Sequence, residues 1–425
     1  MRIALWLLAL FAVAVAAALF AGSNPGSITL FWPPYRIDLS LNLVLALLVA
    51  SFLTLHLALR ALSALFSIPR AARLWRLRQR ERSMQQALLD AFSQLAAGRF
   101  VRARKAAESV LVQLAVIESG GDGLGYAARL RAVAHLLAAE AAHALQDHGV
   151  REQHYRTALE QASKGGSPET REGVQLRAAR WALDDRDATL ALQLLDEMGQ
   201  GAARRTLALR VRLRAARMAR RTPVALETAR LLAKHRAMSD TAAHGVLRGL
   251  AIELIEAAHD PAQLQKAWAQ LEDGERALPD VAIHAAERLR TLGGDSALGR
   301  QWLLPVWDTM VGRPGALSQQ QSVELVRALE RGFSDSSGAP DAAWLARIES
   351  AQTGNPGDAL LQYLAGVTCM RLQLWGKARQ LLTHSLARLQ DVALRRDAWR
   401  LLAELAQQHG DADAATQAWR NAAQA

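Results

Sequence analysis

The chain has 425 residues, half of them hydrophobic but only 5% aromatic, and alanine and leucine dominate, a balance that predicts helices rather than a β-sandwich or β-barrel. Cys369 is its single cysteine, which excludes an intramolecular disulfide and any multi-cysteine zinc site. Much of the net charge of +11 lies in one short segment near the N-terminus, which argues against nucleic acid as a partner of the large remainder.

Two uncharged runs predict transmembrane helices at residues 3–21 and 41–59, each 19 residues long. Such helices reach about 28 Å, close to the roughly 30 Å of a bilayer's hydrocarbon core. In the loop between them, Pro25 and Gly26 mark a turn, residues 27–32 could be extended, and Trp32 and Tyr35 are suited to the membrane interface. Residues 1–60 are thus expected to form a membrane anchor with a short periplasmic loop. Alternatively, the first run is a signal peptide cleaved near the alanines at 16–18.

Residues 61–82 form a basic connector beside the second run. From Arg60 to Arg82 the net charge is +6, because seven arginines are opposed by Glu81 alone. The positive-inside rule then places the large domain in the cytoplasm, whether or not the first run is cleaved. The arginines could set topology alone or also bind anionic lipid headgroups. The candidate lipid-facing residues are Arg70, Arg73, Arg76, Arg78, Arg80 and Arg82.

Residues 83–425 predict an array of helical hairpins. Apolar helical stretches alternate with breaks at glycine and proline, near the period of about 34 residues of tetratricopeptide (TPR) repeats. In the last hairpin, small Ala403 and Ala415 would let two helices approach, Gly410 would permit the turn, and Trp399 and Trp419 would fill space against neighbouring helices. The predicted fold class is all-α: two transmembrane helices followed by a TPR-like α-solenoid, with degenerate repeats between about 200 and 340.

Other hairpins follow the same pattern less closely. The hairpin before the last has Gly366, Trp375, Ala378 and Leu382 at repeat positions. Earlier in the chain, Gly98 and Asp187 occupy the positions of an inter-helix turn.

Three segments add a family resemblance to this architecture. They are Leu374-Trp375-Gly376-Lys377-Ala378-Arg379, Asn24-Pro25-Gly26 after the first run, and Gly98-Arg99-Phe100. With them, essentially the whole chain resembles the proteobacterial HemY family. This resemblance implies a multi-pass protein of the bacterial inner membrane with a cytoplasmic TPR domain, associated with late haem synthesis and with late haem-biosynthesis enzymes as partners. The chain is not similar to the flavin-dependent porphyrinogen oxidase that bears the same name in other bacteria.

Two patterns could hide cofactor chemistry. Gly123, Gly125 and Ala128 fit a dinucleotide fingerprint after residues 110–117, but no further strand–helix units follow, so 110–117 is better explained as a repeat helix. Haem iron could be bound by histidine, cysteine or methionine, yet no Cys-x-x-Cys-His motif is present. The candidate ligands to haem iron are Cys369, Met370, His135, His143, His148 and His154. No catalytic, cofactor-binding or metal residue is assigned, although transient porphyrin or haem binding remains an alternative.

A repeat array usually binds protein segments on the face formed by the first helix of each hairpin. Repeat geometry predicts that the last two hairpins direct eight residues to that face, the alternative being ordinary solvated positions. They are Tyr363, Val367, Met370, Arg371, Asp397, Arg400, Glu404 and Gln408. The leading hypothesis is therefore a non-enzymatic scaffold for haem-pathway enzymes. The alternatives are a direct porphyrin or haem carrier and a general envelope assembly factor unrelated to haem.

Overall fold

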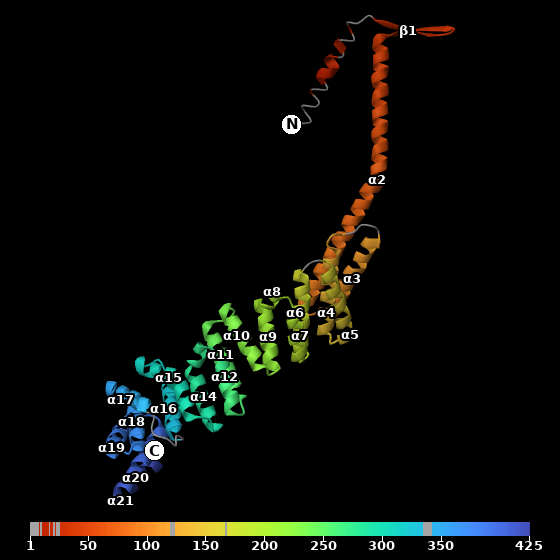
Figure 1. Ribbon diagram of the computed structural model, residues 1–425. Coiled ribbons are helices and arrows are strands. Elements are labelled where there is room, and N and C mark those ends of the chain that lie inside the picture. The colour runs from red at the N-terminus through yellow and green to blue at the C-terminus, as the bar shows by residue number, and fades with distance from the viewer. Residues whose placement is uncertain are drawn as a thin grey trace. The chain divides into compact units, whose positions relative to one another are not determined.

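The computed structural model describes residues 8, 11–16, 18, 19, 22, 26–119, 124–165, 168–334 and 342–425. The chain divides into two compact units, residues 1–170 and residues 171–425. Apart from one β-hairpin, the secondary structure of the described residues is helical (Figure 1). The predicted all-α class is confirmed.

The described part of the first unit begins with a β-hairpin. Strands β1 (Ser27–Trp32) and β2 (Tyr35–Ser40) pair antiparallel, with Pro33 and Pro34 at the turn and Trp32 opposite Tyr35. The extended segment predicted at 27–32 is confirmed. Its partner strand was not predicted, although Arg36 and Asp38 alternate with apolar residues there. Asn24 and Pro25 lie outside the described residues.

Helix α2 (Leu41–Ala96) follows directly and is 56 residues long. The side chain of Ser40 caps it by accepting a hydrogen bond from the Leu43 amide at 3.3 Å. Its segment Leu41–Ser63 is long and apolar enough to cross a membrane, and no other described residue buries it. Among the described residues this is the one such helix, and it includes the predicted span 41–59. The other predicted span, 3–21, lies mostly outside the described residues.

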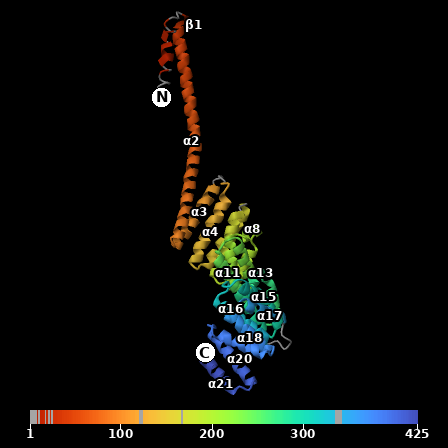
Figure 2. The same cartoon turned by 90° about the vertical axis from the view of Figure 1, so that its left-hand side faces the viewer.

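The C-terminal part of α2 is also the first helix of the helical array. It packs against α3 (Phe100–Ser119) (Figure 2). The paired helices α4 (Ala127–Ala144) and α5 (His148–Lys164) follow (Figure 1). Met84 and Ala91 of α2 are fully buried in this packing. The helix therefore passes the predicted boundaries at residues 60 and 82 without a break.

The second unit continues with helices joined by short turns, and α6 spans the boundary between the units. Prolines begin several helices where the sequence predicts breaks, at Pro261 and Pro279 for example. The helices are α6 (Pro168–Asp184), α7 (Ala188–Asp196), α8 (Gln200–Ala203), α9 (Thr206–Met218), α10 (Thr222–Lys234), α11 (Asp240–Glu256), α12 (Pro261–Gln270), α13 (Asp273–Arg276), α14 (Pro279–Thr291), α15 (Ser296–Gly312), α16 (Gln319–Ser334), α17 (Ala342–Gly354), α18 (Ala359–Arg371), α19 (Trp375–Leu386), α20 (Val392–Gln408) and α21 (Ala412–Gln424).

One turn geometry recurs between paired helices. A residue with positive φ ends the first helix, and the next amide donates to the carbonyl five residues back, as from Leu374 to Cys369 at 2.9 Å and from Asp411 to Ala406 at 3.0 Å. Gly410 has a φ of 76°, which confirms its predicted role. The same position is also filled by residues other than glycine, at some conformational cost. These are Gln146, Arg186, Arg220, Arg236 and Gln373.

Small residues set the close contacts in the last two hairpins. A Cβ added to Gly366 would lie 2.8 Å from Cγ of Leu382 on the paired helix, so the predicted close approach is present. Ala403 and Ala415 are buried, also as predicted. Trp419 on α21 is 37% exposed, and its predicted contact with a neighbouring helix stays a prediction.

The two helical glycines of the α18–α19 hairpin make a matched pair for a stability test. Gly366→Ala is expected to lower the free energy of opening this hairpin by roughly 1–3 kcal/mol, because the added methyl overpacks against Leu382. Gly376→Ala meets nothing within 4 Å and should be neutral or stabilising by about 0.5–1 kcal/mol. Hydrogen exchange of the α18 and α19 amides measures both, and equal effects would contradict the packing.

Candidate functional site

Helix α18 does not present an open binding face. All nine residues from Leu361 to Cys369 are buried, including Tyr363 at 0% and Val367 at 3% exposure. The prediction that Tyr363 and Val367 line a groove is therefore wrong. The helix is apolar on every side, a pattern that indicates a buried helix rather than one with a solvated face.

Tyr363 instead serves as an internal polar link. Its hydroxyl donates to Oε1 of Glu330 on α16 at 2.8 Å. Burial, the Glu330 carboxylate and Asp397 raise the pKa of Tyr363, and burial raises the pKa of Glu330. The Tyr363–Glu330 hydrogen bond thus ties α18 to α16, and the charge of Asp397 on α20 acts on both groups.

The other predicted groove residues are more accessible. Met370 is partly buried against the core, and Asp397 is half-buried and forms an ion pair with Arg400 at 3.6 Å. Exposed positions are found at Arg371, Arg400, Glu404 and Gln408. The usable part of the predicted surface is therefore confined to the C-terminal end of α18 and one side of α20.

The Trp375 to Ala378 segment makes structural contacts. The Trp375 ring meets the His409 ring edge-on with centroids 6.2 Å apart, and Lys377 Nζ lies 2.8 Å from Oε1 of Glu349 on α17. Ala378 is fully buried. Together these contacts join α19 to the helices before and after its own hairpin.

At the other end of the chain, the side chains suited to a membrane surface are exposed. Trp32 and Tyr35 are 70% and 71% exposed at the tip of the β-hairpin. In the connector, Arg76, Arg78, Arg80 and Arg82 are exposed along α2. The side chains of Arg70 and Arg73 lie outside the described residues.

Two of the candidate haem ligands face each other. His135 on α4 and His154 on α5 have their Nδ1 atoms 2.8 Å apart, so one ring donates a hydrogen bond and the other accepts it. Burial is the main cause that lowers both pKa values, that of His135 to about 4, and the neighbouring charges of His154 and Arg131 lower it further. His143 approaches Arg151 instead, at 2.8 Å.

The remaining cofactor patterns have structural roles. Cys369 is buried within α18, and burial raises the pKa of its thiol. Residues 110–117 belong to helix α3, with Val110, Leu114 and Ile117 buried. A dinucleotide site would require a strand at this point, and the segment is a helix instead. Gly123 lies outside the described residues. No group of three or more possible metal ligands occurs among the residues that the structure describes.

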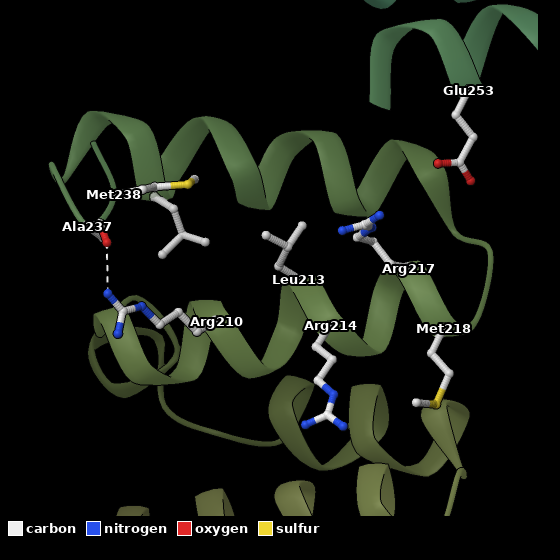
Figure 3. A pocket seen from close by; sticks show the side chains of 9 residues that line it. Arg210, Leu213, Arg214, Arg217, Met218, Ala237, Met238 and Glu253 are labelled. Carbon is white, nitrogen blue, oxygen red and sulfur yellow. Dashed lines mark hydrogen bonds between the residues drawn. The ribbon is translucent and has the colours of Figure 1, made fainter. Parts of the chain in front are cut away.

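A pocket that the sequence analysis missed lies in the second unit. It has a volume of about 670 Å³ and is formed by α9, α10, the loop after α10 and α11 (Figure 3). Three arginines leave successive turns of α9 beside it, with Leu213 between Arg210 and Arg214, and Met218 and Met238 lie at its sides. The lining residues are Arg210, Leu213, Arg214, Arg217, Met218, Leu232, Ala237, Met238 and Glu253.

A local charge count would have found this pocket. Between Arg204 and Arg221 the chain has eight arginines and no acidic residue. The charge summed over residues 83–425 conceals this run because acidic residues are spread over the other helices. Summing charge helix by helix would have revealed the arginine stripe, which we define as Arg210, Arg214 and Arg217.

Comparison with protein families agrees with the N-terminal architecture. Residues 26–118 match the family described as HemY protein N-terminus. This range contains the β-hairpin, all of α2 and nearly all of α3. The identification of a HemY-family protein is thereby confirmed. Comparison with curated protein sequences gave no match.

Several solved structures show a distant likeness. The chain is 15% identical to a chain of the APC/C hetero-tetramer Cut9–Hcn1, covering 80% of this chain and 66% of that one, with a TM-score of 0.26. It is 15% identical to the P58(IPK) TPR domain, covering 77% and 99% with a TM-score of 0.23, and 10% identical to a chain of Naa15/Naa10 bound to HypK-THB, covering 78% and 67% with a TM-score of 0.23. TM-scores this low do not establish the fold, so the helical array rests on the packing of this chain's own helices.

The histidine pair predicts a local dependence on pH. Because the folded-state pKa values are lowered, the contribution of the neutral pair to stability is complete above the unfolded pKa of 6.5 and is lost as pH falls toward about 4. The equilibrium constant for opening the α4–α5 hairpin should therefore increase as the pH is lowered from 7 to 5. Hydrogen exchange corrected for intrinsic rates measures it. A variant with His135→Gln and His154→Gln should lose this rise, and an unchanged rise would contradict the assignment.

Proposed function

We propose that this chain is a membrane-anchored, non-catalytic adaptor in a late step of haem (porphyrin) biosynthesis. The observation that supports it most is α2, which is apolar and uncovered from Leu41 to Ser63 and then packs as the first helix of a helical array. One continuous helix thus joins a membrane-crossing segment to a surface of the type that binds proteins. The link to haem comes from the HemY N-terminal match.

The proposed topology has two spans, residues 3–21 and 41–59, with the β-hairpin on the periplasmic side. The exposed Trp32 and Tyr35 support an interfacial position for the hairpin tip. The arginines that follow Ser63 support delivery of the TPR-like array, residues 83–425, to the cytoplasmic face of the bacterial inner membrane. They could also bind anionic lipid headgroups there.

In this proposal the array binds late haem-pathway enzymes and so holds them near the membrane, where poorly soluble porphyrins could pass between them. The exposed side chains at the end of α18 and on α20 form one available surface, with Arg371 and Arg400 as its cationic members. Their role is binding rather than catalysis.

Crosslinking in native membranes tests this function. The full-length protein should co-purify with late haem-pathway enzymes, identified by mass spectrometry, and without stoichiometric absorbance at the porphyrin band. Replacing Arg371 and Arg400 by alanine should reduce the yield severalfold, because a charged rim contact is lost. Arg420→Ala is the matched control, since Arg420 is exposed on α21, the second helix of the last hairpin.

Two results would contradict the adaptor. One equivalent of pigment without the enzymes would indicate a porphyrin or haem carrier. Capture of envelope proteins alone would indicate a general assembly factor.

A further inference from the structure

The arginine stripe on α9 holds like charges close together. Arg210, Arg214 and Arg217 are four and three residues apart, so their side chains emerge on one face of the helix. Like charges at this spacing destabilise a helix, and no acidic residue lies between Arg204 and Arg221 to offset them. Among the described residues, Arg214 and Arg217 make neither a hydrogen bond nor an ion pair, whereas Arg210 donates to the Ala237 carbonyl at 2.8 Å.

The surroundings of the stripe are concave and apolar. Leu213 of α9 and Leu232 of α10 line the pocket, and the thioethers of Met218 and Met238 lie at its sides (Figure 3). Methionine side chains adapt to ligands of varied shape because they are flexible and polarisable. The pocket therefore has an apolar surface flanked by guanidinium groups.

We propose that this pocket binds a short acidic, amphipathic segment of a partner protein, with carboxylates on the arginine stripe and apolar side chains against Leu213, Met218 and Met238. The proposal rests on the adaptor function and specifies the chemistry of its partner. Successive arginines are four and three residues apart, about 6 and 4.5 Å along α9, which matches carboxylates spaced four and three residues apart on a bound helix. Helix α9 is also the first helix of its hairpin with α10, the position from which repeat arrays bind peptides.

The lining favours a peptide over other polyanions. Nucleic acid binding commonly uses aromatic side chains for base stacking, and none lines this pocket. Glu253 projects from α11 into the lining and is held by a hydrogen bond from Thr222 at 3.2 Å. This carboxylate can accept a hydrogen bond from a peptide amide, whereas the sugar-phosphate backbone of duplex DNA has no N–H or O–H donor to offer it. A concave apolar pocket also fits a flat membrane surface poorly.

The test measures binding to the full-length protein in detergent micelles by fluorescence anisotropy. The probe is a labelled peptide with glutamates four and three residues apart and leucines between them, and its scrambled version is the peptide control. The protein variant carries Arg214→Gln and Arg217→Gln. Its control carries Arg220→Gln and Arg221→Gln, which remove the same charge from exposed positions outside the pocket.

The patterned peptide should bind more tightly than the scrambled one, and the pocket variant should weaken binding about tenfold or more. The control variant should change the affinity for the patterned peptide by less than about threefold. The affinity should fall as the NaCl concentration rises from about 50 mM to about 300 mM, because salt screens exposed charges. Because the pocket variant removes like-charge repulsion, its midpoint temperature of thermal unfolding should be unchanged or slightly higher. Such a result would show that the variant loses binding without losing its fold.

Equal loss in both variants, equal binding of both peptides, or no binding of either would overturn the proposal. So would preferential binding of a duplex oligonucleotide of equal charge. None of these results would bear on membrane capture of haem-pathway enzymes, which tests the adaptor function separately.

Discussion

The exposed apolar surface of α2 is the constraint on which the rest of the structure depends. Eleven large apolar side chains between Leu43 and Leu62 are exposed, and none of the residues that the structure describes covers them. At about 1.5 kcal/mol or more each, removing them from water is worth over ~15 kcal/mol. That exceeds the roughly 5–15 kcal/mol by which a typical domain is stable. A bilayer would cover this apolar surface, which supports the proposal that α2 anchors the protein in a membrane.

The continuity of α2 has consequences for the array. Among the described side chains of α2, packing in the first hairpin begins at Leu77, about 20 Å along the helix from Ser63. The intervening segment carries the arginines that suit anionic headgroups. Because the helix has no loop at this point, rotation of the anchor and rotation of the first hairpin are coupled. An adaptor built in this way would hold its first hairpin, α2 with α3, at a set distance from the membrane.

The sequence predicts features that depend on local chemistry. Proline at a helix start, Gly410 at a turn and Gly366 at a close contact each act through their own backbone, so they could be recognised without the fold. The left-handed conformation of Gln373 and Arg186 was not recognisable, since tertiary packing forces an ordinary residue into it. The repeat pattern does not predict the burial of Tyr363, because an idealised repeat gives every first helix a solvated side.

The binding chemistry was harder to predict than the fold. The arginine stripe is visible in the sequence as a run without acids, yet only the structure brings Met238 and Glu253 beside it. His135 and His154 lie 19 residues apart, and the facing of their rings depends on how α4 packs on α5. In both cases the chemistry arises from contacts between helices.

The most direct test of the membrane anchor is cysteine accessibility in intact cells. With Cys369 replaced by alanine, single cysteines would be placed at Ser27 in the β-hairpin and at Ser119 at the end of α3, both of which are exposed. A membrane-impermeant thiol reagent, applied with the outer membrane permeabilised, should label Ser27→Cys at once and Ser119→Cys only after the inner membrane is broken. Labelling of both before disruption, or of Ser119→Cys alone, would contradict an anchor that places the array in the cytoplasm.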